Sequence, residues 1–378
     1  MEGSGRQAPV FYVCPQSGPA LPWRPPEIPW APPALSRDFC LDLRYLGKVL
    51  AAMSKYLRRE GLTVYITRDV KQELPSYGPH VVAVVLGDEW ARVPTYQHKV
   101  GAVFKRYGTK PYLLCDPWRD PSYRTLRKIV QYCHRWAKAV PGRLSLAAHT
   151  GSLRVGGLPI YVLPLGYFNQ VDLPLRDIQE RSVDVLFDGS AAPRPYSRLS
   201  PKRYVGTVKE LSRADMLRSA RRLAADRPDL VVRIVLSGAF AESSDPSGVT
   251  YSEGLMDAKI CLSPRGNVEE TCRLYEAWRS GCIPVTERLL PLWFHRDSPY
   301  VRVNDDWSDL TQAVVSVLGD ATRLRSLHEA SLRHWRETCS EEVVGAFMAE
   351  RLDALAAVPA LQRHGGSHAH IAPPREPS

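Results

Sequence analysis

The chain has 378 residues, of which 44% are hydrophobic and 24% are charged. This composition is typical of a soluble globular protein with two domains of ordinary size, and it excludes a disordered or fibrous chain. No apolar stretch approaches the roughly 20 residues that a membrane-spanning helix needs. The N-terminus also lacks a basic segment followed by an apolar run. We therefore expect a cytoplasmic protein without a membrane span.

The formal net charge of +10 suggests an acidic partner. Nucleic acid is one such partner, yet the sequence has no zinc-finger spacing, no aromatic RNA-binding strand motif and no Lys-rich arm. A cleft that holds a nucleotide diphosphate or an anionic acceptor accounts for the charge equally well, so we do not expect nucleic-acid binding. The eight cysteines include no CxxC pair, which favours free thiols in a reducing compartment.

The first half of the chain opens with a strand at residues 11–14 and a Pro-rich loop at 15–34. Prolines at this density exclude regular structure and predict an extended loop, either a lid over a site or a rigid surface loop. A helix over residues 36–60 follows. Further strands or strand ends are expected at 64–68, 81–87 (buried on both faces), 102–108, 111–115 and 159–166, with a helix at 122–139 before the last of them.

The second half alternates strands and helices in the same way. Strands are expected at 183–190, 231–237 (buried), 260–262, 282–285 and 300–303, and helices at 267–281, 307–318 and 321–339. This alternation predicts an α/β protein with two doubly wound parallel-sheet domains. We place the first domain at residues 1–168, the second at 169–361, and a disordered polar tail at 362–378.

A polar loop joins a strand to a helix within KICLSPRGNVEETCRLYEAWRSGCIPV, residues 259–285. Such a loop presents backbone N–H groups and the positive end of a helix at one point, which suits a phosphate. Asn267 followed by Glu270 fits a capping pattern, so the helix is predicted to begin at Asn267. Ser263, Arg265 and Asn267 would lie at that positive end, with Arg265 able to pair with a diphosphate.

The same helix is predicted to bury one face. Leu274, Ala277 and Trp278 have the spacing of a core-facing stripe. Glu276 falls on the opposite side, together with Glu269, Arg273 and Ser280. A solvated acidic face is the plain interpretation of Glu276; beside a phosphate loop, its carboxylate would instead accept hydrogen bonds from sugar hydroxyls.

The segment SPRGNVEETCRLYEAWRSGCIPV resembles the C-terminal motif of exostosin-like glycosyltransferases. Four upstream segments resemble, in order and spacing, bacterial members and the ribitol-xylosyltransferase branch. These segments are VVLGDEW, FKRYG, YVLPLGYF and VLFDGS. The resemblance therefore covers roughly residues 80 to 290. The chain departs from the family pattern at Val268 and Trp278. The resemblance implies a GT-B fold, in which two Rossmann-like domains face each other across a cleft and the second domain holds a nucleotide-sugar donor.

The resemblance also implies roles for the donor-side residues. Glu276 would accept hydrogen bonds from the ribose, and Arg265 with the backbone near Gly266 would stabilise the diphosphate. Ligands of open α/β sheets bind at the carboxyl ends of the strands, which adds Gly189 and Ser190. The remaining donor-site candidates are Asn267, Arg273, Ser263 and Arg203, the last in a basic group with Arg194, Arg198 and Lys202.

Retaining GT-B enzymes pair two glutamates eight residues apart, but position 268 is Val, which favours an inverting transfer. Inversion needs a general base from the acceptor side. Asp88 and Glu89 follow the 81–87 strand, and we expect Glu89 to be the base; the alternative is that either residue caps the next helix. His98, His149 and His295 are weaker candidates.

We expect no cofactor and no metal, because no DxD pair has a metal-binding context. Asp305-Asp306 is interpreted as a helix cap. The expected activity is that of a glycosyltransferase (a hexosyl- or pentosyltransferase) moving a sugar from a nucleotide-diphosphate donor to a carbohydrate or small-molecule hydroxyl. Two alternatives remain: a nucleotide-sugar epimerase on the same fold, and a non-catalytic module that binds glycan or nucleic acid.

Overall fold

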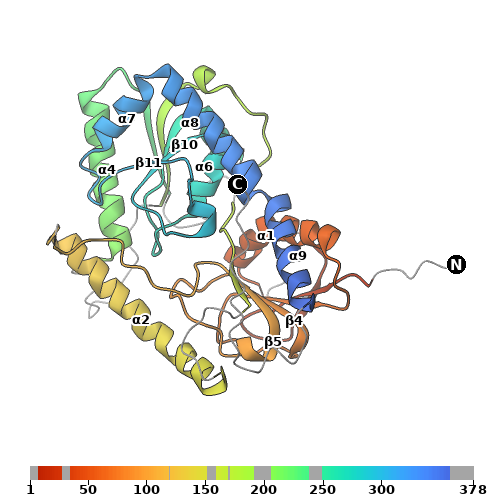
Figure 1. Cartoon of the computed structure of the whole chain (residues 1–378). Helices are drawn as coiled ribbons and strands as arrows, with labels where there is room; N and C mark the ends of the chain where they lie inside the picture. Colours follow the sequence, from red (N-terminus) through yellow and green to blue (C-terminus); the bar gives the residue numbers. More distant parts are fainter. Residues whose placement is uncertain are drawn as a thin grey trace.

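The computed structural model describes residues 7–27, 35–118, 120–150, 159–168, 171–190, 206–237 and 249–357. They form two α/β units, one above the other in Figure 1, with a long helix, α2, along one flank. The tail at 362–378, part of the Pro-rich loop (28–34), and Arg194, Arg198, Lys202 and Arg203 lie outside the described residues. All eight cysteines are described, and each is a free thiol.

The first sheet has the strand order β2-β1-β3-β4-β5-β6. Its strands are β1 (Val10–Val13), β2 (Leu21–Trp23), β3 (Thr63–Thr67), β4 (Gly78–Val85), β5 (Val100–Lys105) and β6 (Ile160–Val162). All pairs are parallel except β1 with β2. The apolar run at Val81 to Val85 is fully buried, as predicted for a central strand. Residues 111–115, predicted as a strand, form a loop.

Strand β2 corrects the expectation that the Pro-rich segment has no regular structure. Leu21 pairs with Val13 and Trp23 with Phe11. Proline is tolerated in an edge strand, where its missing N–H costs no ladder bond. Trp23 is buried, and its indole N–H donates to the Glu27 carbonyl at 2.6 Å, so a side chain anchors this edge to the core.

The second sheet is wholly parallel, with the order β11-β10-β9-β7-β8. Its strands are β7 (Val183–Ser190), β8 (Val232–Ser237), β9 (Ala258–Leu262), β10 (Ile283–Thr286) and β11 (Val301–Arg302). Strand β8, predicted to be buried, is an edge strand with Val235 41% and Leu236 49% exposed. The chain adds β8 on one side of β7 and then crosses to add β9 on the other side.

The principal helices are α1 (Arg37–Tyr56), α2 (Tyr123–Thr150), α4 (Val208–Asp226), α5 (Val249–Asp257), α6 (Cys272–Ser280), α7 (Leu310–Leu318), α8 (Ala321–His334) and α9 (Glu341–Ala357). Side-chain caps fix the N-termini of two of these helices. The Ser36 hydroxyl accepts from the Phe39 N–H at the start of α1, and Thr207 and Glu210 form a capping box at the start of α4. None of the described helices combines the length and apolar character needed to cross a bilayer.

Helix α6 begins later than predicted. Thr271, not Asn267, occupies the N-cap position, and Cys272 is the first helical residue. The amide of Asn267 is used elsewhere, because its Nδ2 donates to Glu89 at 2.6 Å. The C-terminus matches the sequence, since Gly281 adopts the left-handed conformation (φ 68°) that ends many helices.

One hydrophobic core connects the two units. It includes Leu43 and Phe104 from the first half, Leu274 and Trp278 from the second, and Trp335 after α8. Helix α9 lies within the predicted second domain, yet it packs against α1 of the first half, as Figure 1 shows. The shared core and this returning helix hold the two sheets against each other.

Candidate functional site

The reversal of strand order between β7 and β9 marks where a ligand would bind in the second unit. In open parallel sheets, the crevice lies at the carboxyl ends of the strands where the order reverses. Those ends are Asp188–Ser190 of β7 and the loop that follows Leu262 of β9. Gly189, Ser190 and Ser263, predicted from the sequence, therefore lie at this edge.

Arg273 reaches this edge from the first turn of α6. Its Nε donates to the Asp188 carbonyl at 2.9 Å, its Nη2 donates to the same oxygen, and its guanidinium lies 4.9 Å from the centre of the Phe187 ring. A Cβ on Gly189 would displace the guanidinium, and the φ of 156° at this residue is one that side chains rarely adopt, so glycine is favoured there. The structure thus brings Gly189 and Arg273, both predicted from the sequence, into one contact.

Arg213 of α4 brings a second guanidinium to the same place. Its Nη1 donates to the Ser190 carbonyl, two residues beyond the carbonyl that Arg273 uses. Burial and the positive charge of Arg273 lower the pKa of Arg213 to about 10, with Glu287 acting in the opposite direction. Two neighbouring cations at the end of a strand give this edge a positive charge. Sequence reasoning missed Arg213, because it lies in an ordinary Arg-rich helix.

Glu276 does not lie on a solvated face, and that prediction is wrong. The residue is 4% exposed. Its Oε1 accepts from the Phe168 N–H at 3.0 Å and its Oε2 from the Tyr251 hydroxyl at 2.6 Å. Most of α6 is buried, so the side that the sequence pattern assigns to solvent faces other protein segments instead.

Asp188 is a second carboxylate that sequence reasoning missed. Burial raises its pKa; the Arg273 charge opposes this shift and the Glu276 charge adds to it. A carboxyl with a perturbed pKa at the switch point of a sheet is a recognised feature of functional sites. The available signal was its position, directly before Gly189 in the VLFDGS motif.

Arg265 is buried and already paired. Its Nη2 lies 2.7 Å from Glu269 and 3.1 Å from the side-chain oxygen of Gln131. Its backbone N–H donates to Glu287 at 3.1 Å. Arg265 therefore fixes the 263–271 loop through these internal contacts, and its pairing with a diphosphate stays a prediction. At Gly266, an added Cβ would meet no atom closer than 3.4 Å, so space does not require glycine there.

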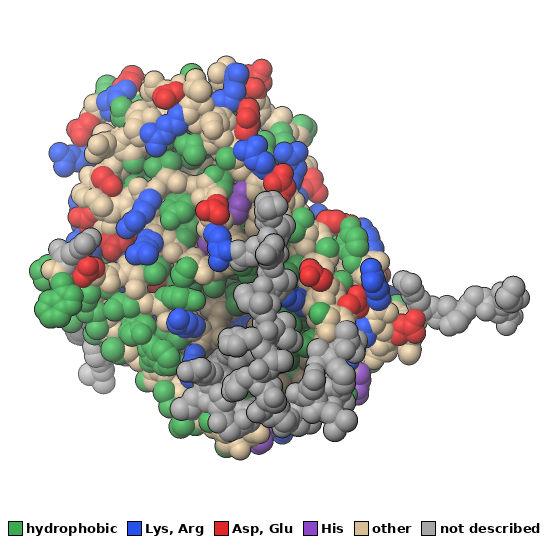
Figure 2. Space-filling model, viewed as in Figure 1, with side chains coloured by type: hydrophobic (Ala, Val, Ile, Leu, Met, Phe, Trp, Pro, Cys, Tyr) green, Lys and Arg blue, Asp and Glu red, His purple; other side chains and the backbone are tan. Residues whose placement is uncertain are grey.

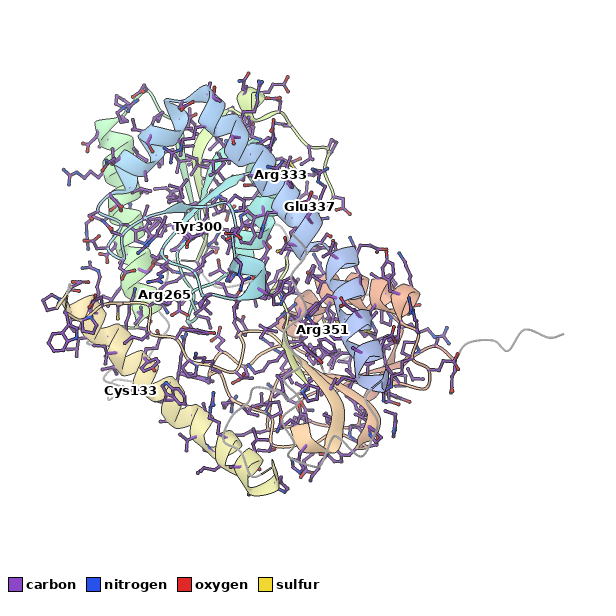
Figure 3. The ribbon with its side chains drawn as sticks, viewed as in Figure 1. Cys133, Arg265, Tyr300, Arg333, Glu337 and Arg351 are labelled. Atoms are coloured by element: carbon purple, nitrogen blue, oxygen red, sulfur yellow. The ribbon has the colours of Figure 1, made fainter. Side chains whose placement is uncertain are left out.

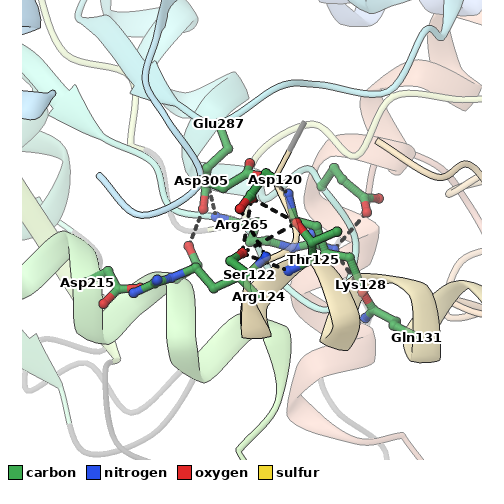
Figure 4. Close-up of polar contacts among 12 residues, drawn as sticks. Asp120, Ser122, Arg124, Thr125, Lys128, Gln131, Asp215, Arg265, Glu287 and Asp305 are labelled. Atoms are coloured by element: carbon green, nitrogen blue, oxygen red, sulfur yellow. Dashed lines mark hydrogen bonds and ion pairs between the residues drawn. The ribbon is translucent and has the colours of Figure 1, made fainter. Parts of the chain in front are cut away.

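Helix α2 supplies two partners of this loop, and Figure 4 shows one of them, Gln131, on the same side of the loop as Arg265. Gln131 Nε2 donates to the Asn267 carbonyl at 2.8 Å, and Arg135 donates to the same oxygen and lies 3.2 Å from Glu269. Figure 3 places Arg265 close to this junction. Lys128 pairs with Asp305 at 2.5 Å. The predicted cap at Asp305-Asp306 is therefore wrong: Asp309 holds the N-cap position of α7.

Asp88 has a structural environment. It is 1% exposed, 3.0 Å from Lys105 and 2.6 Å from Arg92, and it accepts from the Arg92 backbone N–H at 2.8 Å. Burial alone would raise its pKa, but Lys105 and Arg92 outweigh that effect and hold the pKa below its usual range. A carboxylate neutralised by two cations is a poor base, which corrects Asp88 as a catalytic candidate. It caps a turn, not the predicted helix.

Glu89 meets the second unit. Its Oε2 accepts from Asn267, which brings a carboxylate of the first sheet to the loop that follows β9. The weaker histidine candidates have other contacts: His98 stacks on His149, and His295 Nε2 lies 3.3 Å from Glu270. Among the described residues, no three His, Cys, Asp or Glu side chains form a metal-binding group.

Comparisons with known proteins add only a general likeness. No family model matches the chain, and no curated protein matches it, so the exostosin-like resemblance stays a prediction. Solved structures similar to it include sucrose-phosphate synthase from Thermosynechococcus elongatus, at 14% identity and a TM-score of 0.41 over 93% of this chain and 100% of that one. The glycosyltransferase AviGT4 matches at 11% identity and a TM-score of 0.38 over 93% and 99%.

A GtfA/B complex matches at 12% identity and a TM-score of 0.40, over 74% of this chain and 58% of that one. Likenesses this distant carry no argument about activity. The fold class rests on the structure itself, whose two parallel-sheet α/β units confirm the predicted GT-B class.

Proposed function

We propose that the protein is a glycosyltransferase that takes its sugar from a nucleotide-diphosphate donor bound at the carboxyl ends of β7 and β9. The observation that carries this proposal is that two guanidiniums, from Arg213 and Arg273, bind the backbone carbonyls of Ser190 and Asp188 where the strand order of the second sheet reverses. The carboxylates of Asp188 and Glu276 lie near enough to affect each other electrostatically. Cations suit a diphosphate, and carboxylates suit ribose hydroxyls.

The donor would lie with its diphosphate between Arg213 and Arg273, near the N-terminus of α6. Each guanidinium uses part of its donor set on a backbone carbonyl and keeps other N–H groups. The Glu276 carboxylate, which accepts from the Phe168 N–H and the Tyr251 hydroxyl, would also accept from a ribose hydroxyl. Arg265 contributes indirectly, by holding the 263–271 loop.

The transfer would be a single displacement with inversion and without a metal. Glu89 would take the proton of the acceptor hydroxyl while the nucleotide diphosphate leaves from the opposite face of the sugar. The growing charge on the leaving group would be stabilised by the two arginines, in the role that a divalent ion has in other enzymes. The contact from Asn267 would orient the Glu89 carboxylate.

Calorimetric titration with UDP, GDP, ADP, CMP and dTDP tests this site. One nucleotide diphosphate should bind selectively. Arg213→Gln should weaken that binding by about tenfold, from the loss of a charge-assisted hydrogen bond. Arg222→Gln is the matched control, because Arg222 lies on the same helix with its side chain 80% exposed.

Equal affinity of the two variants would remove Arg213 from the site. No binding of any of the five nucleotides would argue against a nucleotide-sugar donor. Once a nucleotide is known, a labelled donor distinguishes transfer from epimerisation, because only transfer moves the label to a second molecule. Activity that is lost in EDTA and restored by Mn²⁺ would contradict the metal-independent chemistry.

A further inference from the structure

Over its first half, helix α2 turns a polar face inward. Arg124 Nε donates to Asp215 of α4 at 2.7 Å, Lys128 pairs with Asp305, and Gln131 and Arg135 hold the Asn267 carbonyl. Farther along the same face, Gly142 packs so closely that an added Cβ would collide with the Val93 carbonyl. The side of α2 that contacts the protein is therefore mainly hydrophilic for three to four turns.

The opposite side of α2 is apolar and faces outward. Apolar or small residues recur on it at alternating spacings of three and four: Tyr123, Leu126, Val130, Cys133, Ala137, Val140 and Leu144. Leu126 is 55% exposed and Leu144 57% exposed. Figure 2 shows hydrophobic side chains gathered over α2, and Figure 3 labels Cys133 on this helix. The stripe, which we call the outer α2 stripe, runs for about 30 Å.

Trp118, just before α2, is 94% exposed and adds a large aromatic surface at the start of the helix. A surface helix normally buries its apolar stripe and exposes its polar side. Here the arrangement is reversed over the first half of α2. A contiguous apolar surface of this length marks a contact with a partner.

Charge determines which partner fits. Helix α2 contains six Lys or Arg residues and no Asp or Glu. Three of them, Arg124, Lys128 and Arg135, pair with acidic residues of the protein. The other three flank the outer α2 stripe at helical spacing, Arg127 and Lys138 on one side and Arg143 on the other. Arg127 and Arg143 are part-buried and donate to backbone carbonyls, which leave their charge in place, and Lys138 is exposed. A second copy of α2 would place the same cations opposite one another, which disfavours self-association. An anionic surface would meet them favourably, and the whole chain carries +10.

We propose that the outer α2 stripe lies flat on an anionic lipid bilayer. Its Leu and Val side chains would enter the boundary between headgroups and acyl chains, and Trp118 and Tyr123 would lie at headgroup level, where amphipathic aromatic rings are favoured. The exposed Lys138 would contact lipid phosphates, and the charges of Arg127 and Arg143 would add to the attraction at longer range. This contact goes beyond the proposed transfer reaction and does not depend on it.

Co-sedimentation of the full chain with unilamellar vesicles tests the proposal. Vesicles of mixed phosphatidylglycerol and phosphatidylcholine should bind the protein, and pure phosphatidylcholine vesicles should bind it much less. Binding should fall in about 1 M NaCl, where the Debye length is only about 3 Å. The double variant Leu126→Gln with Leu144→Gln should reduce the partition coefficient about tenfold or more, because two apolar side chains are lost from the contact.

Leu175→Gln is the matched control, since Leu175 is 55% exposed but lies in the segment between the two sheets. Its vesicle binding should equal that of the wild type. Lys138→Gln should lower binding about fivefold, the contribution of one cation near a charged surface. Circular dichroism and nucleotide titration of each variant would report an intact fold, because every substituted side chain is exposed.

Two results would overturn the proposal. One is absence of binding to the anionic vesicles, or binding that the double variant leaves unchanged. The other is a protein that does not bind vesicles but forms dimers in light scattering, with the dimers lost in the double variant; the outer α2 stripe would then be a protein interface.

Discussion

At the scale of single residues, two arginine side chains bind backbone carbonyls at the end of β7. Arg273 uses the carbonyl of Asp188, and Arg213 uses the carbonyl of Ser190. Gly189, between these two residues, leaves the space that the Arg273 guanidinium fills. A missing side chain is therefore part of the proposed diphosphate site, since any Cβ at residue 189 would displace one of its cations.

Gly189→Ala should weaken nucleotide-diphosphate binding about tenfold, because Arg273 would lose its place over the strand and with it a charge-assisted contact to the ligand. Gly266→Ala is the matched control: it replaces another glycine of the predicted donor site, where the new Cβ meets only ordinary contacts. Isothermal titration of both variants with the preferred nucleotide measures the difference. Equal affinities would show that Arg273 does not contact the ligand.

Glu89→Gln should leave nucleotide affinity unchanged and reduce the transfer rate by roughly 10²–10⁴, the range for loss of a general base. The amide oxygen of Gln can still accept from Asn267, so the loop contact survives the substitution. Glu73→Gln, at an exposed position, is the control. Single-turnover kinetics with a labelled donor gives the rate, and a normal rate in Glu89→Gln would assign the base role to another group.

The sequence predicts a residue's position well where the backbone determines it, and poorly where distant partners do. Gly189 and Ser190 lie at the carboxyl end of β7, as their place after an apolar run predicts. The sequence predicts that Arg265 contacts a ligand, but in the structure its side chain contacts Gln131 and Glu269. Gln131 lies 134 positions earlier in the sequence. Nothing in the local pattern identifies a partner so far away in sequence.

At the scale of elements, the 263–271 loop is held by charge. Glu269, buried in the loop, lies 2.7 Å from Arg265 and 3.2 Å from Arg135 of α2. Burial alone would raise the pKa of Glu269, but the two guanidiniums outweigh it and hold the pKa below its usual range. These contacts also explain the late start of α6, because the residues predicted as its first turn are bound to α2 instead.

Glu269→Gln should lower the stability of the protein by about 3–5 kcal/mol, because two buried cations lose their shared counter-charge. The effect should depend on pH. Since the folded-state pKa is depressed, the contribution of Glu269 is complete above the unfolded value of about 4.3 and is lost as pH falls through the folded pKa. Thermal unfolding between neutral and acidic pH measures it: the two proteins should differ at neutral pH and converge in acid.

A difference in melting temperature that stays constant down to acidic pH would contradict the electrostatic origin of the effect.

Apolar runs in the sequence predict most of the strands. They also predict that β8 is buried, because its sequence is as apolar as that of its neighbours. Its exposure follows from its position as the last strand of the sheet, which is a property of topology and not of the segment. The outer α2 stripe escaped notice for a related reason: an apolar helical face is ordinarily interpreted as core.

At the scale of the whole molecule, the C-terminal helix α9 returns to the first α/β unit. Helix α9 follows the second sheet in sequence but packs on α1, and Tyr45 of α1 donates to the Cys339 carbonyl at 2.7 Å just before α9. Two α/β units that share one core and a returning helix are not free to move independently. The boundary predicted near residue 168 falls between the two sheets, after β6 and before β7.

The crossing of α1 and α9 depends on Gly345. A Cβ there would lie 2.6 Å from the Ala52 Cβ and 2.7 Å from the Val49 carbonyl oxygen, and that backbone cannot move aside as a flexible side chain would. Gly345→Ala should therefore destabilise the protein by about 1–3 kcal/mol through overpacking, although alanine is the better helix former.

Gly254→Ala in α5 is the control with the opposite sign, because its new Cβ would meet only a Leu186 methyl at 3.7 Å. It should stabilise the protein by up to about 1 kcal/mol. Thermal unfolding of both variants beside the wild type decides the matter: if Gly345→Ala melts at or above the wild-type temperature, α9 does not hold the two halves together through this close contact.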